Sequence, residues 1–474
     1  MSAGARTAPR RLMGGGREHR SSILVAALSA AFGVVLLQVT EALATMIGAA
    51  DMSQHGSARL ALAIVAFVFI AIAVYVGAIV TANTFATIIA GRTRTIALLR
   101  LVGASSRTLR RAVAGEGLRV GIVGALAGAL IGTAISFGVL RAGVAQGLIP
   151  DLGYALFTPV IAAPVVIVVA STWLSSWVGS RRVLAVQPIQ ALGAAEESSY
   201  EAARRRPARN AAALCLAVLG LVFLAAGVAV GLVSPVGVLV GLVGGLLSFT
   251  GLILGSHLVM PPVLRLTGVL GGRSAPARLA AANALRYPER SSRATIGLVI
   301  GVTLITMFAV AGQSYQDMMH RAQEAQPELY QGEDQVVAAT VAIFSVLIGF
   351  SALIAAVGMI NNLALSVLQR TRELGLLRAL GFTATQVRRM ILAESAQMSL
   401  AAVGLGLVLG IFYGWAGAQS LLGWQGGVGL IWPSVPWPLV VACAVGAAAL
   451  SLVASVSPAR RATTVSPIVA LAAE

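Results

Sequence analysis

The stretch "RTRELGLLRALGFTATQVRRMILAE" (370–394) has a weaker copy, "RTRTIALLRLVGASSRTLRRAVAGE" (92–116), earlier in the chain. Each copy predicts an amphipathic helix with a glycine break near its middle, at Gly103 and Gly381. We expect one face to be aliphatic, with Ile96, Leu99, Val102, Leu109 and Val113 in the first copy and Leu374, Leu377, Leu380, Val387 and Ile391 in the second. A residue order kept in two diverged copies favours a docking surface for a protein over a helix that only anchors in lipid headgroups.

Two further pairs of segments extend the repeat beyond this helix. "RRVLAVQPIQAL" (181–192) returns as "RRATTVSPIVAL" (460–471), and "RSS" occurs at 20–22 and at 290–292. Three matched pairs in the same order indicate two homologous halves. Asn83 also matches Asn361, and each lies in an apolar stretch. We expect these amides to form helix–helix contacts, with contact to a substrate as the weaker alternative.

The composition indicates an all-α polytopic membrane protein, because 58 % of the 474 residues are apolar and only 11 % are charged. A membrane-spanning helix needs about 20 apolar residues. By this measure the sequence predicts ten spans, at about 23–48, 60–90, 118–140, 159–179, 210–232, 236–262, 294–315, 336–368, 396–420 and 437–456.

The distribution of arginine predicts the orientation of these spans. All 34 basic residues are arginine, and only Arg59, Arg141 and Arg321 fall on one side of the ten-span arrangement. Because basic loops stay in the cytoplasm, both termini are predicted to be cytoplasmic, in a bacterial plasma membrane. The arginines behind the net charge of +17 then set the orientation of the spans and contact anionic lipid headgroups. We therefore expect no nucleic-acid partner.

The spans and repeats together divide the chain into segments, with the two halves related as a parallel repeat. These are a basic N-terminus (1–22), a first half (23–192, core 62–192), a linker (193–209), a two-helix insert (210–263), a lead-in (264–293) and a second half (294–474, core 336–471).

The repeated helices, together with "NNLALSVLQ" (361–369) and "PARRATTVSPIVAL" (458–471), resemble the FtsX-like permease family of ABC transporters. The resemblance implies that each helix docks on one copy of a cytoplasmic ATPase subunit, so that two copies bind. The residues that it implies for docking are Arg92, Arg94, Leu98, Leu99, Arg100, Gly103, Arg110 and Arg111, then Arg370, Arg372, Glu373, Leu376, Leu377, Arg378, Gly381, Arg388 and Arg389.

The chain departs from that family pattern in two respects. Relatives of the bacitracin-export type carry a large extracellular domain between spans seven and eight, where this chain has only about 316–335. In addition, Thr95 occupies the position of Glu373, so we expect the second helix to bind its ATPase more strongly.

The absence of lysine excludes ATP hydrolysis by this chain, because a P-loop needs a lysine for the nucleotide phosphates. ATP and Mg²⁺ are therefore expected on the partner subunit. The four scattered histidines have no ligand spacing, so we expect no metal, no bound cofactor and no catalytic residue in this chain.

The leading hypothesis is a permease subunit that exports or extracts a hydrophobic or amphiphilic substrate. The main alternative is a mechanotransmitter that uses ATP to control a cell-wall enzyme or a sensor without transport. An ion-coupled secondary transporter would need charged residues near the middle of the membrane, and the predicted spans contain none at that depth.

Overall fold

The computed structural model describes residues 20–49, 56–91, 93–146, 151–154, 157–181, 207–270, 288–325, 380–424 and 429–438, with scattered positions at 279–285, 348–353 and 440–449. Within these residues all regular structure is helical, and seven helices are long and apolar enough to cross a membrane. The protein is thus an all-α membrane protein, as predicted. The count of ten spans and the side of the termini stay predictions, because 336–368 and most of 437–456 lie outside the described residues.

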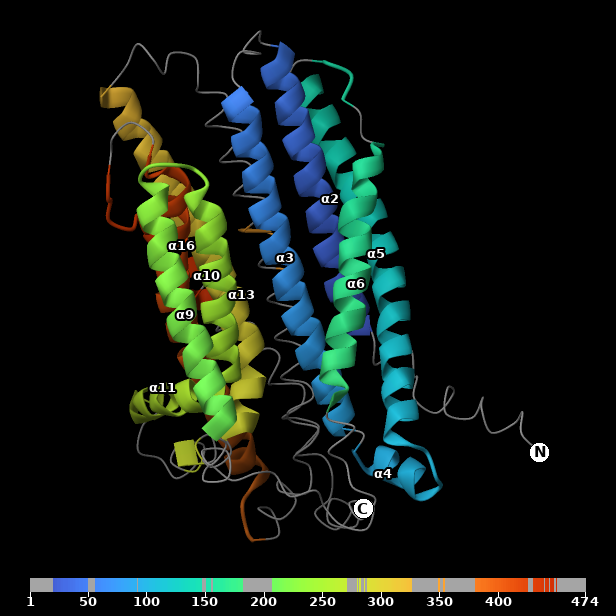
Figure 1. Ribbon diagram of the computed structural model, residues 1–474. Helices are drawn as coiled ribbons and strands as arrows, with labels where there is room; N and C mark the ends of the chain where they lie inside the picture. The colour runs from blue at the N-terminus through green and yellow to red at the C-terminus, as the bar shows by residue number, and fades with distance from the viewer. Residues whose placement is uncertain are drawn as a thin grey trace, which may run out of the picture. The chain divides into compact units, whose positions relative to one another are not determined.

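The chain divides into two compact units, Met1–Ala195 and Glu196–Glu474, and each is described by itself. The first contains α2 (Arg20–Ala49), α3 (Gly56–Gly91), α4 (Thr93–Leu101), α5 (Ser106–Ala145), η2 (Pro159–Ile161) and α6 (Ala162–Gly179). Figure 1 shows α2, α3, α5 and α6 as upright neighbours, with the short α4 at the lower end of α5.

Small side chains let the four long helices of this first unit approach closely. Ala26, Ala30, Ala125 and Val168 form a buried cluster from α2, α5 and α6. A Cβ atom at Gly128 of α5 would collide with the carbonyl oxygen of Ala27 in α2. Close approach of helix backbones at small residues is the usual basis of helix association in lipid, where burial of apolar surface supplies no driving force.

The second unit contains α9 (Pro207–Gly231), α10 (Gly237–Leu254), α11 (Ser256–Leu270), α13 (Pro288–Ala325) and α16 (Ala384–Leu422). The helices α9 and α10 form a hairpin, which turns at Ser234 and Pro235. Their backbones meet at glycines, since a Cβ atom at Gly227 would lie 2.5 Å from the amide nitrogen of Gly241. In this unit α13 also packs along α16, as α2 packs along α5 in the first.

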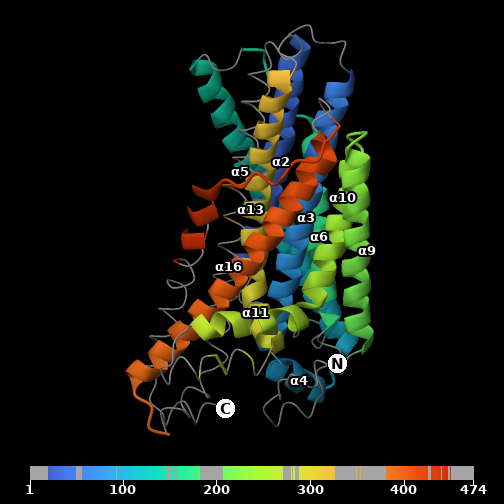
Figure 2. The same cartoon turned by 90° about the vertical axis from the view of Figure 1, so that its left-hand side faces the viewer.

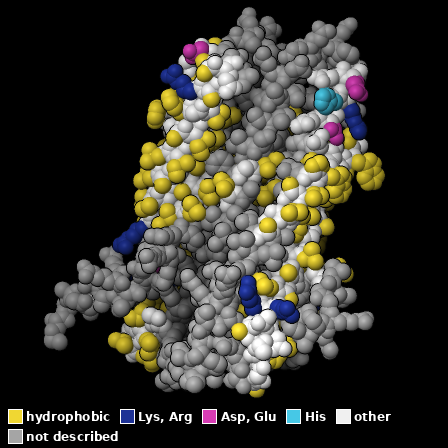
Figure 3. Space-filling model, turned by 180° about the vertical axis from the view of Figure 1, so that it is seen from behind, with side chains coloured by type: hydrophobic (Ala, Val, Ile, Leu, Met, Phe, Trp, Pro, Cys, Tyr) yellow, Lys and Arg dark blue, Asp and Glu magenta, His cyan; other side chains and the backbone are white. Residues whose placement is uncertain are grey.

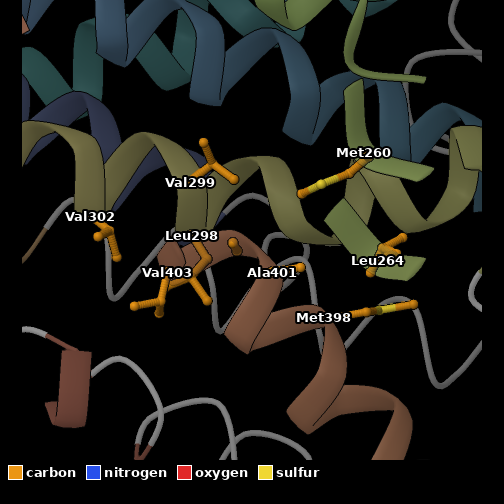
Figure 4. Close-up of a cluster of buried hydrophobic side chains, with 9 residues drawn as sticks. Met260, Leu264, Leu298, Val299, Val302, Met398, Ala401 and Val403 are labelled. Carbon is orange, nitrogen blue, oxygen red and sulfur yellow. The ribbon is translucent and has the colours of Figure 1, made fainter. Parts of the chain in front are cut away.

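The predicted sixth span (236–262) is wrong at its inner end. The helix stops at Leu254, where Gly255 forms the C-cap, and α11 begins as a separate helix that lies across α13 and α16 (Figure 2). Met260 and Leu264 of α11 are buried against both of these helices (Figure 4), and Gln397 Nε2 donates a hydrogen bond to the Leu264 carbonyl at 2.8 Å. The apolar run continued past Gly255 because α11 buries its apolar face in protein rather than in lipid.

The duplication extends to the packing between helices. Gly128 of α5 faces the Ala27 carbonyl of α2, and Gly406 of α16 faces the Val299 carbonyl of α13. Gly128 and Gly406 are separated by the same number of residues as the two repeated helices. Ala27 and Val299 are separated by fewer residues. The offset of the "RSS" pair is shorter still, so this pair is out of register with the helix packing.

The surfaces of the described helices fit a lipid environment. On the face seen in Figure 3, hydrophobic side chains cover the middle of the described parts, and charged side chains gather near the upper and lower ends. The helix α13 continues to Ala325, well past the predicted end of its span at 315. Part of the predicted outer loop (316–335) is thus a helical extension of the span.

Candidate docking surface

The first repeated helix is held by a small apolar core at one end of the first unit. Ile96 and Ala97 of α4 are almost completely buried. They pack with Phe85 of α3 and with Leu109 and Val113 of α5. Three residues of the aliphatic face expected from the sequence, Ile96, Leu109 and Val113, thus lie inside the chain rather than on a free docking surface. This core thus joins α4 to both α3 and α5.

A tight turn joins α4 to α5 and requires glycine. Gly103 has a φ of +99°, a conformation that residues with a Cβ atom rarely adopt. The amide of Ala104 donates to the Leu99 carbonyl at 2.9 Å, and the amide of Gly103 donates to the Arg100 carbonyl at 3.1 Å. These two bonds form a Schellman motif, which satisfies the last carbonyls of α4. Ser105 then caps α5 by accepting a hydrogen bond from the Thr108 amide.

The second repeat contains the same turn. Gly381 also has a φ of +99°. Thr383, which corresponds to Ser105, caps α16 and forms a capping box with Gln386. Val387 and Ile391, which belong to the aliphatic face expected for the second copy, are buried beyond the cap. The repeat therefore preserves the backbone conformation of this turn as well as its residue order.

One described residue of the expected aliphatic face is exposed in each copy while other described residues of that face are buried. Val102 and Leu380, which correspond to each other, are 88 % and 72 % exposed. Each directly precedes a left-handed glycine, Gly103 or Gly381, which redirects the chain, so helical periodicity does not apply across this position. Leu98 and Leu101 of α4 are also exposed. We call Leu98, Leu101 and Val102 the first apolar patch, and Leu380 marks its counterpart in the second unit.

Several arginines lie near these positions along the chain. Arg107 and Arg111 are exposed on the first turns of α5, Arg100 is half-buried on α4, and Arg389 is exposed on α16. Exposed apolar residues together with exposed arginines are suited to a protein partner that carries acidic groups.

Arg110 has a different role, because it connects α5 to the end of α6. Its Nε donates to Ser180 Oγ at 3.2 Å and its Nη2 donates to the Trp177 carbonyl at 3.4 Å. The guanidinium carbon also lies 4.2 Å from the centroid of the Trp177 ring. We call this set of contacts the Arg110 clamp. Sequence reasoning missed Trp177 and Ser180, although Ser180 directly precedes the repeated "RR" of residues 181–182 and Trp177 lies four residues before it.

The aligned positions of the second half carry different residues from those of the clamp. When the "RR" of 181–182 is aligned with the "RR" of 460–461, Val456 and Ala459 replace Trp177 and Ser180. Arg388, which corresponds to Arg110, has a buried Nε with no hydrogen-bond partner among the described residues. The two repeated helices thus differ in how they are fixed to the rest of their halves.

We predict that Arg110→Ala lowers the free energy of unfolding of the first unit by about 1 kcal/mol, because it removes the stacking on Trp177 and both hydrogen bonds. The neighbouring Arg111→Ala serves as the control, since Arg111 is exposed. Hydrogen exchange of the 174–181 amides in the full chain measures the effect. Equal exchange in the two variants would contradict the clamp.

Several predicted docking residues lie outside the described part of the chain. They are Arg92, Arg370, Arg372, Glu373, Leu376, Leu377 and Arg378, together with Asn361. Arg94 is described only as part of the α4 backbone, and Asn83 is half-buried in α3. The contacts predicted for Asn83 and Asn361 stay predictions. Among the described residues no group of three or more His, Cys, Asp or Glu side chains is placed to hold a metal ion.

Comparison with known proteins defines the class to which this architecture belongs. The family model described as FtsX-like permease C-terminal matches residues 67–188 and 345–467, which together make up just over half of the chain. The two matches coincide with the two predicted cores. The chain belongs to the FtsX-like permease family, and its sequence contains two copies of the family domain.

Individual relatives resemble shorter parts of the chain. The uncharacterized ABC transporter permease YknZ of Bacillus subtilis is 30 % identical over 145 residues, which cover 30 % of this chain and 34 % of YknZ. The ABC transporter permease YtrF of the same organism is 30 % identical over 26 % of this chain and 30 % of YtrF. The macrolide export ATP-binding/permease protein MacB of Rhodopirellula baltica is 34 % identical over 29 % of this chain and 19 % of MacB. The similarity thus spans about a third or less of each relative.

Proposed function

We propose that this chain is the membrane permease subunit of an ABC transporter, and that each repeated helix docks on one copy of a separate cytoplasmic ATPase. The observation that carries the proposal is the pair of matching turns. Gly103 and Gly381 share a φ of +99°, and each turn exposes an aliphatic side chain, Val102 or Leu380. The relatives named as ABC transporter permeases support the same assignment.

The proposal places ATP and Mg²⁺ on the partner. The name of MacB describes a single protein as both ATP-binding and permease. The chain described here contains no lysine for the phosphate-binding loop, and a separate P-loop subunit would supply it. Two docking helices in one chain correspond to two ATPase copies. With the arginine-rich segments inside, both termini and both docking helices are cytoplasmic.

The transported molecule, on this proposal, is hydrophobic or amphiphilic. The described helices carry mainly aliphatic side chains. The exposed ones on α5 and α9, such as Leu130 and Leu214, are suited to contact with lipid. A mechanotransmitter without transport is the alternative, and both functions require the same docked ATPases. ATP-dependent removal of labelled amphiphiles from vesicles that contain the purified complex would separate them, because only a transporter depletes its bilayer.

Native mass spectrometry of the tagged full chain tests the docking proposal directly. The chain is purified from its own membranes in mild detergent with ATP and Mg²⁺. We expect the mass of one chain plus two copies of a lysine-containing P-loop protein. A folded chain that carries no such protein, under conditions that retain other membrane complexes, would refute the proposal.

A further inference from the structure

The segment that follows α16 runs back along that helix without forming a helix itself. Residues 429–436, which we call the outer segment, include Gly429 with a φ of +66°. Figure 2 shows this part of the chain, in red, crossing α16. Two side chains of α16 hold it in place, and both are polar groups in an otherwise apolar part of the helix.

Gln419 and Trp415 satisfy the backbone of the outer segment. Gln419, which is completely buried, donates from Nε2 to the Gly429 carbonyl at 2.7 Å and accepts at Oε1 from the Ile431 amide at 3.3 Å. Trp415 Nε1 donates to the Ile431 carbonyl at 2.6 Å. Non-helical backbone is tolerated at membrane depth only where its polar groups are satisfied by protein. These bonds therefore allow the segment to lie within the outer leaflet.

An apolar groove of about 600 Å³ lies between α16 and the outer segment. It is lined by Val408, Ile411, Phe412 and Trp415 of α16 and by Leu430, Ile431, Trp432 and Pro433 of the segment. The Nε1 of Trp415, a polar atom of this lining, already donates to Ile431. A polar ligand would lose its hydration and gain little hydrogen bonding from these side chains, so the groove selects hydrocarbon.

The depth of the groove indicates where its occupant comes from. Val408 and Trp415 lie four turns and two turns before the end of α16 at Leu422, which is about 21 and 10 Å along the helix. A single leaflet has about 15 Å of hydrocarbon. Counted from Leu422, the groove begins at Trp415 within the hydrocarbon of one leaflet and extends past the inner limit of that leaflet at Val408. Its volume falls within the range of small-molecule sites.

We propose that the groove binds one acyl chain of an outer-leaflet phospholipid, which fixes the outer segment against α16. The bound acyl chain would cover Leu430 and Trp432, which are 65 % and 91 % exposed although both are large and apolar. This binding site is independent of the docking proposal, because it involves the opposite end of α16 from Gly381. Gln419 is the residue that positions the outer segment for it.

Photolabelling tests this site in the full chain. The chain is reconstituted in phosphatidylglycerol and phosphatidylethanolamine vesicles that contain a phosphatidylglycerol with a diazirine in one acyl chain, and labelled peptides are mapped. We expect labelling of 408–415 and 430–433 that saturates as the mole fraction of the probe rises. Labelling that rises in proportion to the probe, as on the lipid-facing side of α5, would overturn the proposal.

A groove-filling variant provides the second measurement. Val408→Trp places an indole in the groove, and we expect the labelling of 430–433 to fall several-fold. Leu130→Trp is the matched control, because Leu130 is 75 % exposed on α5 and Val408 is 66 % exposed on α16. Retained labelling of 430–433 in Val408→Trp would show that the groove does not bind the acyl chain. If Val408→Trp does not fold, saturation in the unsubstituted chain decides alone.

Discussion

Val102→Glu is expected to release one of the two ATPase copies, Leu380→Glu the other, and the double variant both. Each residue is exposed in the free chain, at 88 % and 72 %, so a glutamate is tolerated there until a partner covers it. On docking, the carboxylate would be buried against apolar atoms, which costs at least about 2–3 kcal/mol and weakens binding roughly 30- to 150-fold. Native mass spectrometry of each purified variant counts the copies that remain.

The control for this series is Val233→Glu. Val233 is 81 % exposed in the turn between α9 and α10, at the other end of the second unit from Leu380. The substitution is chemically identical, and we expect both ATPase copies to remain. Loss of ATPase in Val233→Glu, or retention of two copies in the double variant, would contradict the assignment of these turns as docking surfaces.

The two single variants also compare the two docking helices. The second copy contains Glu373 where the first has Thr95, and the first copy is fixed by the Arg110 clamp, whose residues Trp177 and Ser180 align with Val456 and Ala459. If the second helix binds more strongly, as the sequence predicts, Val102→Glu should lose its ATPase copy at a lower detergent or salt concentration than Leu380→Glu.

The sequence predicted the parts of this fold that depend on local pattern. Long apolar runs located the spans, and the repeated glycines located both turns, because a left-handed residue leaves a visible preference for glycine. Val102 and Leu380 were assigned to the same face as the buried residues because helical periodicity was extended through Gly103 and Gly381, whose left-handed conformation interrupts it. The helix α11 was merged with α10 because an apolar run does not distinguish burial in lipid from burial against α13 and α16.

The remaining features depend on contacts between segments that are distant in sequence. Gln419 looks like an isolated polar residue at the end of a span, and only the return of the outer segment gives it partners. The Arg110 clamp joins residues 67 and 70 positions apart. The sequence did contain one usable signal, namely the replacement of Trp177 and Ser180 by Val456 and Ala459 in the second half.

The second large effect is expected where α16 packs on α13. A glycine-to-alanine substitution should lower the free energy of unfolding at one position of α16 and raise it at another. A Cβ atom at Gly410 would lie 2.5 Å from Thr306 Cβ and 2.8 Å from the Thr303 carbonyl oxygen. Gly410→Ala must therefore separate the two helices or strain them, which lowers the free energy of unfolding by about 1–3 kcal/mol.

Gly404, which precedes Gly410 on the same helix, provides the control. A Cβ atom there would meet nothing within 4 Å, so Gly404→Ala should stabilise α16 by up to about 1 kcal/mol through helix propensity alone. Unfolding of both variants in mixed micelles with increasing SDS gives the two free energies. In the first half, Gly128→Ala should behave like Gly410→Ala, because its Cβ atom would meet the Ala27 carbonyl. Stabilisation by Gly410→Ala would show that α13 and α16 do not pack at this distance, and the shared packing of the two halves would then be wrong.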